Sequence, residues 1–599
     1  MSVIKKLWSL CEGSKQLLIF GVFCAGMAAM LNLIVPLITR YTVDTLISGE
    51  SSDLPQFVLR AIDNLGGDEW LRQNLWVCGV AIIVIVAVMG VFMFFRGRSI
   101  VTVSENAALK LRETLYDHIQ KLPYEYHVKA QTGDLIQRCT SDVNTVRQFM
   151  ASRVIELVRM VFTLSIALFF MFSLHTQLAL VSVAVVPFII VFSIKYYKRV
   201  SEIFHKVDVK EGELHTVLQE NLSGVRVVRA FGREKFEIDK FEVKNDEFKE
   251  LTIKWLNMQA VFWATANTLT LLQYGLIVVS AIYLNYIGYV SVGTFIAFVT
   301  YANMFLWPVR NLGRILSDFG QSGVALKRID EVLDVGQDKE DEAWLMPSLK
   351  GDIVFDGVHF GFTKDNEVLK GMSFHVKRGQ TVALLGATGV GKSTIMHLML
   401  RLYEPQSGSI TINGYPINEI SKKWLRQRIG IVLQETFLYS KTVFENLRMA
   451  DENLDMDEAK LATKTASVHR DIKKFERDYD TLVGEKGVTL SGGQKQRLAI
   501  ARTIIKDCDV LIFDDSLSAV DTETDAQIRQ ALKERGEDVT TFIISQRITT
   551  LMDADVILVM EDGIIADQGT HAELVSRDGL YSKIWNIQTA MEDEFLDDM

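Results

Sequence analysis

The segment TVALLGATGVGKST, residues 381–394, decides the fold of the C-terminal half of the chain. The run TVALL predicts a strand, a glycine-rich loop follows, and KST opens a helical run. The loop matches GxxxxGK[ST], in which glycines let backbone N–H groups approach phosphate oxygens at a helix N-terminus. The expected phosphate ligands are Gly386, Thr388, Gly389, Gly391, Lys392, Ser393 and Thr394. We expect Lys392 to reach the β and γ phosphates of ATP and the Ser393 hydroxyl to bind Mg²⁺.

A second anchor is the apolar run 510–513, which ends in Asp514 and Asp515. A carboxylate at the end of a parallel strand, beside a phosphate loop, is where a Mg²⁺ shell needs an acidic ligand. Asp514 suits that role. The alternative is a turn, because acidic residues commonly follow strands, and the phosphate loop is what favours the metal site.

The N-terminal half carries most of the apolar sequence. Mean hydropathy is +0.17 although the 599 residues include 64 basic and 74 acidic ones, so apolar and polar residues are segregated. Six windows have about the length needed to cross a bilayer. They are residues 17–37, 75–95, 154–174, 178–194, 261–283 and 294–309. A buried core helix is the alternative for any one window, but six windows almost free of charge favour a membrane domain.

The loops between these windows set the predicted orientation. Loops 96–153 and 195–257 hold many Lys and Arg, whereas residues 41–74 are net acidic. The positive-inside rule therefore places both termini, the two long loops and the nucleotide-binding domain in the cytoplasm of a multi-pass cell-membrane protein. Both long loops have a helical period, and they predict helical extensions that reach about 35 Å beyond the bilayer.

The composition changes near residue 325. The predicted division is a transmembrane domain (1–324), a solvated linker (325–350), a nucleotide-binding domain (351–590) and an acidic tail (591–599). Short β-rich runs alternate with helical patterns in the third part. The predicted fold is a multidomain membrane protein, with a six-helix α transmembrane domain and long cytoplasmic helical extensions, followed by an α/β P-loop nucleotide-binding domain.

Composition also excludes several classes of function. The five cysteines form no CxxC pair, so neither a disulfide framework nor a zinc site is indicated. A net charge of −10 argues against a nucleic-acid partner. Nearly charge-free spans argue against small ions and highly charged solutes as cargo, which leaves lipophilic drugs, dyes or lipids. Aromatic residues of the last two spans offer either a promiscuous apolar pocket or ordinary helix packing; they are Trp263, Tyr274, Phe298, Tyr301 and Phe305.

Residues 490–494, LSGGQ, carry a family resemblance. Together with the features above, they resemble the ATP-binding cassette (ABC) transporters, specifically exporters in which a six-span membrane domain precedes one nucleotide-binding domain. The resemblance covers essentially the whole chain. It implies that the signature residues Ser491, Gly492, Gly493 and Gln494 face the ATP held by the other subunit of a head-to-tail dimer.

Further positions follow from the resemblance. It implies that Phe362 stacks on adenine and that Gln434 senses Mg²⁺ and the attacking water. Residues 481–487 resemble the loop that touches the coupling helices, and residues 518–521 resemble the loop that communicates between the two ATP sites. The coupling segments would be residues 124–133 and 220–232, for which ordinary amphipathic helix is the alternative.

Two positions depart from the family pattern. Where a hydrolytic cassette has a glutamate base and a switch histidine, this chain has Asp515 and Gln546. Asp is one methylene shorter than Glu, and misplacement of a catalytic group by about 1 Å can cost about a hundredfold in rate. The Gln546 amide is neutral and cannot take the charge that an imidazole carries. The sequence therefore predicts a site that binds ATP but turns it over poorly.

This pattern resembles the degenerate-site subunit of bacterial heterodimeric multidrug exporters. The expected partner is a homologous half-transporter that carries the missing Glu and His. The expected function is ATP-driven export of lipophilic compounds, with main hydrolysis at a site that the partner's phosphate loop shares with this chain's signature. A lipid flippase subunit and a non-hydrolysing ATP-binding regulator are the alternatives, and the intact signature favours the pump.

Overall fold

The computed structural model of the chain describes residues 3–50, 60, 62–64, 66–338, 345–363, 366–484, 487, 489–517, 524–528, 530 and 538–597. The chain divides into two compact units. The helical unit comprises Met1–Gln120 and Ala130–Gly336, and the α/β unit comprises Lys121–Lys129 and Gln337–Met599. Residues 121–129 therefore belong to the α/β unit, although they lie within the membrane half of the sequence.

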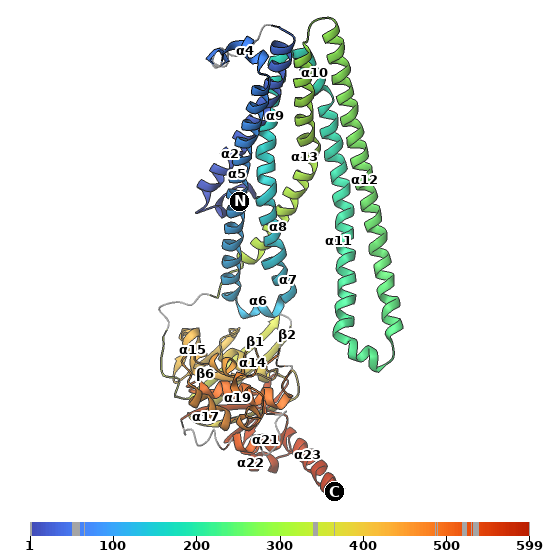
Figure 1. The fold of residues 1–599 in the computed structure, drawn as a ribbon. Coiled ribbons are helices and arrows are strands. Elements are labelled where there is room, and N and C mark those ends of the chain that lie inside the picture. The colour runs from blue at the N-terminus through green and yellow to red at the C-terminus, as the bar shows by residue number, and fades with distance from the viewer. Residues whose placement is uncertain are drawn as a thin grey trace. The chain divides into compact units, whose positions relative to one another are not determined.

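The helical unit consists of long helices joined by short turns (Figure 1). Its elements are α1 (Val3–Leu10), α2 (Lys15–Tyr41), η1 (Thr42–Ile47), α4 (Gly67–Gln73), α5 (Trp76–Gln120), α7 (Thr132–Gln137), η2 (Arg138–Asp142), α8 (Val143–Gln148), η3 (Phe149–Arg153), α9 (Val154–Leu174), α10 (Thr176–Ala184), α11 (Val186–Ala230), α12 (Glu234–Tyr286) and α13 (Val292–Leu333). The helices α11 and α12 run antiparallel, side by side, and the turn between them contains Gly232 with φ of 59° (Figure 1).

Five helices among the described residues are long and apolar enough to cross a membrane. They are Lys15–Ile47, Trp76–Gln120, Thr132–Leu174, Thr176–Ala230 and Glu234–Tyr286. The sixth predicted window lies on α13, where the described apolar stretch is Val292–Met304 and the side chains of Phe305, Leu306 and Trp307 lie outside the described residues. A count of six spans is therefore not confirmed.

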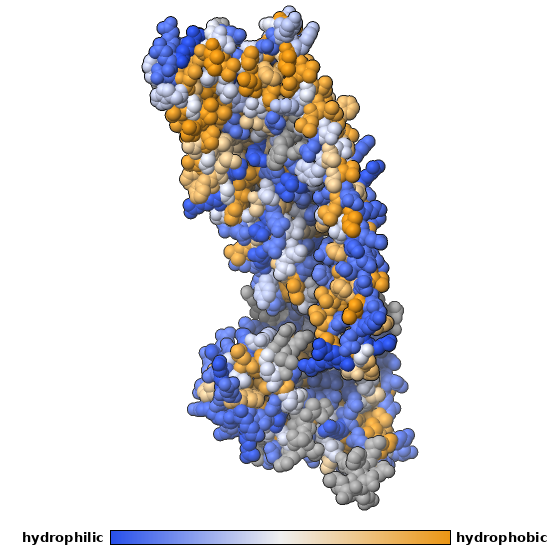
Figure 2. Space-filling model, turned by 45° about the vertical axis from the view of Figure 1, so that its right-hand side comes forward, coloured by the Kyte–Doolittle hydropathy of each residue, from blue (hydrophilic) through white to orange (hydrophobic). Residues whose placement is uncertain are grey.

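The apolar windows turn much of their surface outward. Only 6% of the most apolar window of Trp76–Gln120 is buried within the chain. Figure 2 shows hydrophobic residues gathered over the end of the helical unit that carries α4 and α10. Apolar surface exposed on this scale requires a bilayer or another protein to cover it.

Two of the aromatic residues proposed for a substrate pocket pack inside the helical unit instead. Phe298 and Tyr301 are both fully buried. The Tyr301 hydroxyl donates to the carbonyl of Leu33 at 2.8 Å, and its ring stacks on Phe170 with centroids 5.9 Å apart. In this conformation of the single chain their role is helix packing, and the side chain of Phe305 lies outside the described residues.

The α/β unit contains two sheets. A four-stranded antiparallel sheet has the order β2-β1-β4-β5, and a six-stranded sheet has the order β10-β9-β3-β8-β7-β6. The strands are β1 (Ile353–Thr363), β2 (Asn366–Val376), β3 (Thr381–Gly386), β4 (Ser407–Ile412), β5 (Tyr415–Pro416), β6 (Ile429–Val432), β7 (Val510–Asp514), β8 (Thr540–Ile544), β9 (Val556–Glu561) and β10 (Ile564–Gly569). In the larger sheet only the β9–β10 pair is antiparallel.

The central strands of the larger sheet are buried, and helices surround the two sheets of this unit (Figure 1). They are α6 (Tyr124–Lys129), α14 (Lys392–Met399), η4 (Ile417–Glu419), α15 (Lys422–Arg428), α16 (Val443–Arg448), α17 (Met456–Thr465), α18 (His469–Ile472), η5 (Asp478–Asp480), α19 (Gly492–Ile505), α21 (Ile548–Leu551), α22 (His571–Ser576) and α23 (Leu580–Asp597). Every residue of β7 is buried, as expected for a parallel strand covered on both faces. The ends of β3 and β7 therefore hold fixed positions for the segments that follow them.

The described parts of the predicted linker are ordered structure. Helix α13 continues to Leu333, inside the stretch predicted to be solvated. Leu345 forms a parallel bridge with Ile420, and the Trp424 indole donates to the carbonyl of Pro347 at 2.8 Å. Because charge alone suggested a solvated linker, these non-local contacts were not visible in the sequence.

Candidate nucleotide-binding site

The predicted phosphate loop connects the end of β3 to the start of α14. Gly389 and Gly391 have φ of 86° and 104°, a region that favours glycine. A Cβ on Gly391 would lie 2.7 Å from a methyl of Leu369, and one on Gly386 would lie 2.6 Å from the carbonyl oxygen of Met560. The glycines of the motif are therefore required both by backbone conformation and by close packing.

Lys392 lies across this loop. It is 9% exposed, and its ammonium donates to the carbonyls of Gly386 and Ala387, both at 2.8 Å. Burial lowers the pKa of Lys392, while the negative charges of Asp514 and Asp515 act in the opposite direction. A cation held here, at the N-terminus of α14, is placed to receive phosphate oxygens.

The two predicted Mg²⁺ ligands meet next to the loop. The Ser393 hydroxyl donates to Oδ1 of Asp514 at 3.0 Å. Burial raises the pKa of Asp514, and the Ser393 hydrogen bond, His397 and Lys392 lower it in part. A hydroxyl and a carboxylate are the hard oxygen ligands that suit Mg²⁺. Among the described residues no group of three His, Cys, Asp or Glu stands ready to hold a metal alone, so phosphates and water would complete a Mg²⁺ shell here.

The positions that depart from the family pattern form the outer edge of the same site. Asp515 lies directly after β7 with φ of 45°, and its N–H donates to the carbonyl of Ile544 at 2.9 Å. The Gln434 amide donates to Oδ2 of Asp515 at 3.3 Å, and the Gln546 amide donates to the Thr388 hydroxyl at 3.3 Å. The structure thus brings Gln434, Asp515 and Gln546 together with the phosphate loop.

The C-terminal helix α23 braces this edge. Gln588 accepts from the N–H of Ile548 and donates to the carbonyl of Gln546, both at 2.9 Å. The Gln588 side chain therefore holds the backbone at two points, Gln546 and Ile548. Sequence reasoning missed Gln588, because no local motif marks a contact between residues 42 positions apart.

The signature residues lie at the start of α19. Ser491 and Gln494 form a capping box, in which the Ser491 N–H donates to the Gln494 side chain at 3.0 Å and the Gln494 N–H donates to the Ser491 hydroxyl at 3.3 Å. A Cβ added to Gly492 would meet nothing within 4 Å in this chain. Within the described part of the chain, the signature is an open helix N-terminus in which each of the two capping side chains accepts from the backbone N–H of the other residue. Residues 518–521, predicted to link the two ATP sites, lie outside the described residues.

An aromatic chain joins the predicted adenine-stacking residue to α6. Phe362, 44% exposed, meets Tyr403 edge-on at 5.3 Å between centroids. Tyr403 meets Tyr124 of α6 edge-on at 5.6 Å, and His397 of α14 lies 5.9 Å from Tyr124. Tyr124, Phe362 and Tyr403 line a cavity of about 740 Å³. Tyr124 belongs to the first predicted coupling segment, whereas sequence reasoning did not find Tyr403.

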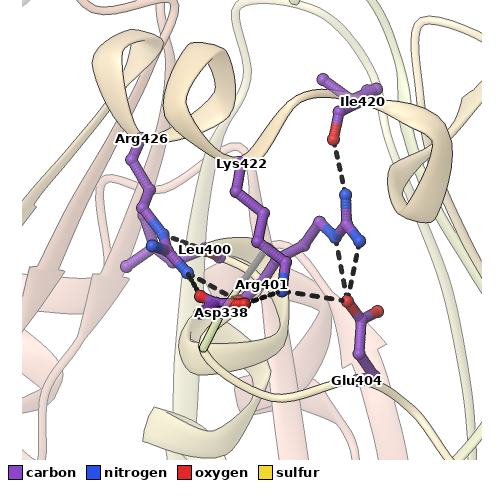
Figure 3. A network of polar contacts seen from close by, with 7 residues as sticks. All are labelled: Asp338, Leu400, Arg401, Glu404, Ile420, Lys422 and Arg426. Carbon is purple, nitrogen blue, oxygen red and sulfur yellow. Dashed lines mark hydrogen bonds and ion pairs between the residues drawn. The ribbon is translucent and has the colours of Figure 1, made fainter. Parts of the chain in front are cut away.

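A charged network lies beside this cavity (Figure 3). Asp338 accepts from Lys422 at 2.6 Å and lies 3.7 Å from Arg426, while its N–H donates to the carbonyl of Lys121 at 2.7 Å. Arg426 also donates to the carbonyl of Leu400 at 3.1 Å, next to the C-terminal end of α14. The figure shows the remaining contacts of the network, from Arg401 to Glu404 and to the carbonyl of Ile420. Asp338 therefore ties the segment after α13 both to α15, through Lys422, and to Lys121, three residues before the start of α6.

Comparison with known proteins shows the family. The profile for the ABC transporter transmembrane region matches residues 18–309, and the profile for the ABC transporter domain matches residues 369–518. The chain is 33% identical over 597 residues to the uncharacterized ABC transporter ATP-binding protein YknU of Bacillus subtilis, covering 98% of both chains.

Other relatives have more specific names. One is the putative multidrug export ATP-binding/permease protein YgaD of Bacillus subtilis, with 31% identity and coverage of 98% and 100%. Another is the ATP-dependent lipid A-core flippase of Saccharophagus degradans, with 32% identity and coverage of 95% and 94%. Among solved structures, a bacterial Atm1-family ABC exporter with ATP bound matches with a TM-score of 0.80 at 25% identity, covering 96% of this chain and 98% of that one. The chain therefore belongs to the ABC transporter family, as a membrane-spanning exporter with an ATP-binding domain at its C-terminal end.

Proposed function

We propose that this chain is one subunit of a heterodimeric ATP-driven exporter of lipophilic compounds. It binds Mg²⁺ and ATP at a degenerate site of its own and supplies its signature to the hydrolytic site of a homologous partner. The observation that supports this most directly is the pairing of an intact phosphate-binding wall with Asp515 and Gln546 at its outer edge.

The binding chemistry rests on residues that the fold already positions. The backbone N–H groups of the phosphate loop and the Lys392 ammonium would hold the β and γ phosphates. Ser393 and Asp514 would bind Mg²⁺, which neutralises charge between the phosphates when it is present. Phe362, half exposed beside Tyr403, offers a ring face for adenine.

Asp515 and Gln546, the two residues that depart from the family pattern, account for the slow turnover that we propose for this site. The Asp515 carboxylate stands one methylene further back than a glutamate would, and it already accepts from Gln434. Gln546 presents a neutral amide, so it supplies no cationic donor to charge that develops on the γ phosphate. With these two residues, the site binds ATP tightly but does not efficiently activate the attacking water.

The signature would act in the partner's site. Ser491 and the glycines after it form a pre-built helix N-terminus, and open space at Gly492 permits the close approach of a γ phosphate. A chain that binds ATP only to regulate has no physical need of this surface. The intact signature is thus the observation that favours a pump over a non-hydrolysing regulator.

A cavity in the helical unit supports the proposed class of cargo. A cavity of about 600 Å³ lies between the helices and has both apolar and charged walls, the latter including Asp142 and Arg328, 3.8 Å apart. An amphiphilic compound with an apolar body and a polar group fits such a lining. Multidrug export and lipid flipping are both compatible with it, and the relatives named above include a protein of each kind.

The proposed topology has six spans, with both termini and the α/β unit in the cytoplasm. The sixth span would include Val292–Met304 of α13. Cysteines introduced at Gly49 and Asn74, which flank the loop after the first span, would react with an impermeant maleimide from outside intact cells. Reaction only after permeabilisation would overturn this orientation.

Vanadate trapping tests the division of labour between the subunits. The complex is purified through a tag on this chain, its composition is read by native mass spectrometry, and trapped photoreactive nucleotide is assigned to each subunit. We expect one copy of this chain with one homologue, ADP trapped on the homologue, and ATP retained here, with Lys392→Ala removing only the latter. A homodimer, or equal trapping on both chains, contradicts the proposal, and a complex without vanadate-sensitive ATPase supports the regulator.

A further inference from the structure

An apolar cavity lies under the N-terminal helix of the helical unit, away from the ATP site. It has a volume of about 300 Å³ and lies among α1, the start of α2, α5, the start of α9 and α13. Its walls include Leu7, Trp8, Leu18, Val103, Leu157 and Phe319. Almost no polar atom faces the cavity, so a ligand part that enters it must be hydrocarbon, because a polar group there would lose its hydrogen bonds.

Helix α1 covers this cavity and is held at its edges by polar contacts. Lys6 forms an ion pair with Asp330 of α13, and Asn106 of α5 donates to the Ser14 hydroxyl at 3.0 Å. Leu7 is 8% exposed, whereas Trp8 is 48% exposed. The family match begins at residue 18, after this helix. A short helix with one buried apolar side, an exposed tryptophan and lysines is typical of a segment that lies at a membrane interface.

Lysines lie next to Trp8, one of the residues that line the cavity. Lys15 and Lys110 each lie 3.7 Å from the carboxylate of Glu12, so that two cations share one anion. Lys15 also lies 5.9 Å from the centre of the Trp8 ring. These lysines are on the same side of the unit as α1, and a phosphate placed between them would balance the charge.

We propose that this cavity binds an acyl chain of an anionic bilayer phospholipid, with the lipid phosphate on Lys15 and Lys110. The cavity lies where the predicted spans end, with Leu18 and Leu157 inside the apolar windows and Val103 and Phe319 beyond them. An acyl chain therefore enters from the edge of the bilayer, and the lysines select the head group. Each buried methylene contributes to binding in the same way as in other lipid-anchored contacts. This lipid site is separate from the cavity of about 600 Å³ that we propose for cargo. Lipid binding here does not require that the protein form a heterodimer.

Native mass spectrometry of the full-length protein, with any subunit that accompanies it, tests this site. The protein is reconstituted in vesicles of equal phosphatidylglycerol and phosphatidylcholine, extracted in mild detergent, and examined for retained lipid. Val103→Phe and Leu157→Phe place a ring in the cavity. Val101→Phe is the matched control, because Val101 is 56% exposed on the opposite side of the same helix. Thermal melting reports whether each variant is folded, and having two cavity variants keeps the test decisive if one is not.

We expect one retained phosphatidylglycerol per chain in the wild type and in Val101→Phe. Both cavity variants should retain at least about tenfold less, the loss expected when two methylene groups lose their burial. The double change Lys15→Gln with Lys110→Gln should abolish the preference for phosphatidylglycerol, whereas Lys249→Gln, at a loosely paired lysine of α12, should preserve it.

Several results would overturn the proposal. They are wild-type lipid retention in folded cavity variants, equal loss in Val101→Phe, equal retention of phosphatidylcholine in the wild type, and detergent as the sole bound molecule, which would indicate an adventitious additive only.

Discussion

The two walls of the ATP site differ in burial and in bonding. On the binding wall, Lys392 and Asp514 are 9% and 6% exposed, and their hydrogen bonds to the loop carbonyls and to Ser393 are 2.8 to 3.0 Å long. On the hydrolytic edge, Gln434 and Gln546 are exposed and make contacts of 3.3 Å. Side chains of the binding wall also pack the sheet, so changing them endangers the fold. The exposed edge can vary without that cost, so the loss of hydrolysis proposed for this site does not require a loss of binding.

The largest expected effect comes from the signature, which serves neither wall of this chain's own site. Gly492→Asp places a negative charge where the partner's γ phosphate must approach. Lost transition-state stabilisation of about 3 kcal/mol corresponds to more than about a hundredfold in steady-state ATPase of the reconstituted complex.

Lys392→Ala is the counterpart of that change on the binding wall. It should weaken nucleotide retention on this chain and leave measurable ATPase, because the proposed function assigns most turnover to the other site. A dead Lys392→Ala complex beside a near-normal Gly492→Asp complex would invert the comparison and disprove the degenerate site.

The complementary test restores the hydrolytic edge and leaves the binding wall unchanged. Asp515→Glu with Gln546→His should raise turnover at this chain's own site by up to about a hundredfold, the size of a positional defect of about 1 Å. The measurement is single-turnover hydrolysis in a complex whose partner phosphate lysine is disabled. No gain, with ATP still bound, would place the limiting defect in the partner's signature.

The adenine side of the site should show a smaller effect. Phe362→Ala removes a stacking surface and is expected to weaken ATP binding by about tenfold, within the 1 to 3 kcal/mol range of base–aromatic stacking. Tyr403→Phe keeps the edge-on packing and should bind normally, whereas Tyr403→Ala should bind more weakly because Phe362 loses its support. Fluorescent-nucleotide titration measures all three, and unchanged binding by Phe362→Ala would remove that residue from the site.

The smallest effect concerns the network around Asp338, which lies outside both walls. Asp338→Asn breaks the partly buried pair with Lys422 and should destabilise the α/β unit by about 1 to 2 kcal/mol without changing ATP affinity. Asp457→Asn is the control, since Asp457 pairs with Lys460 at a side chain that is 90% exposed, and little change is expected. Calorimetry of the full chain measures both. Equal shifts would show that the network contributes no more than a surface pair.

Local motifs explain what could be predicted from the sequence. The phosphate loop, β7 and the signature each depend on consecutive residues, because a strand, a turn and a helix N-terminus set their geometry locally. The membrane segments were predicted by hydropathy, which needs only local composition and length, and five of the predicted windows lie on long apolar helices among the described residues.

Contacts between distant residues could not be predicted. Tyr403 lies opposite Tyr124, and Asp338 lies opposite Lys422, only because the sheets bring those segments together. Composition suggested solvent for Asp338, which the structure places in an ion pair with Lys422. It left a pocket and helix packing both open for Tyr301, and the structure of the single chain shows packing. The roles of Gln434 and Gln546 followed from family resemblance rather than from any physical pattern in the sequence.

The brace between Gln588 and the backbone of Gln546 has a consequence for synthesis of the protein. The hydrolytic edge draws on Thr388, Gln434, Asp515 and Gln546, and α23 fixes its last member. A chain emerging from the ribosome N-terminus first can form its phosphate loop long before that edge is complete. The phosphate loop is therefore complete before the edge is, because Gln588 is made after every other residue of that edge.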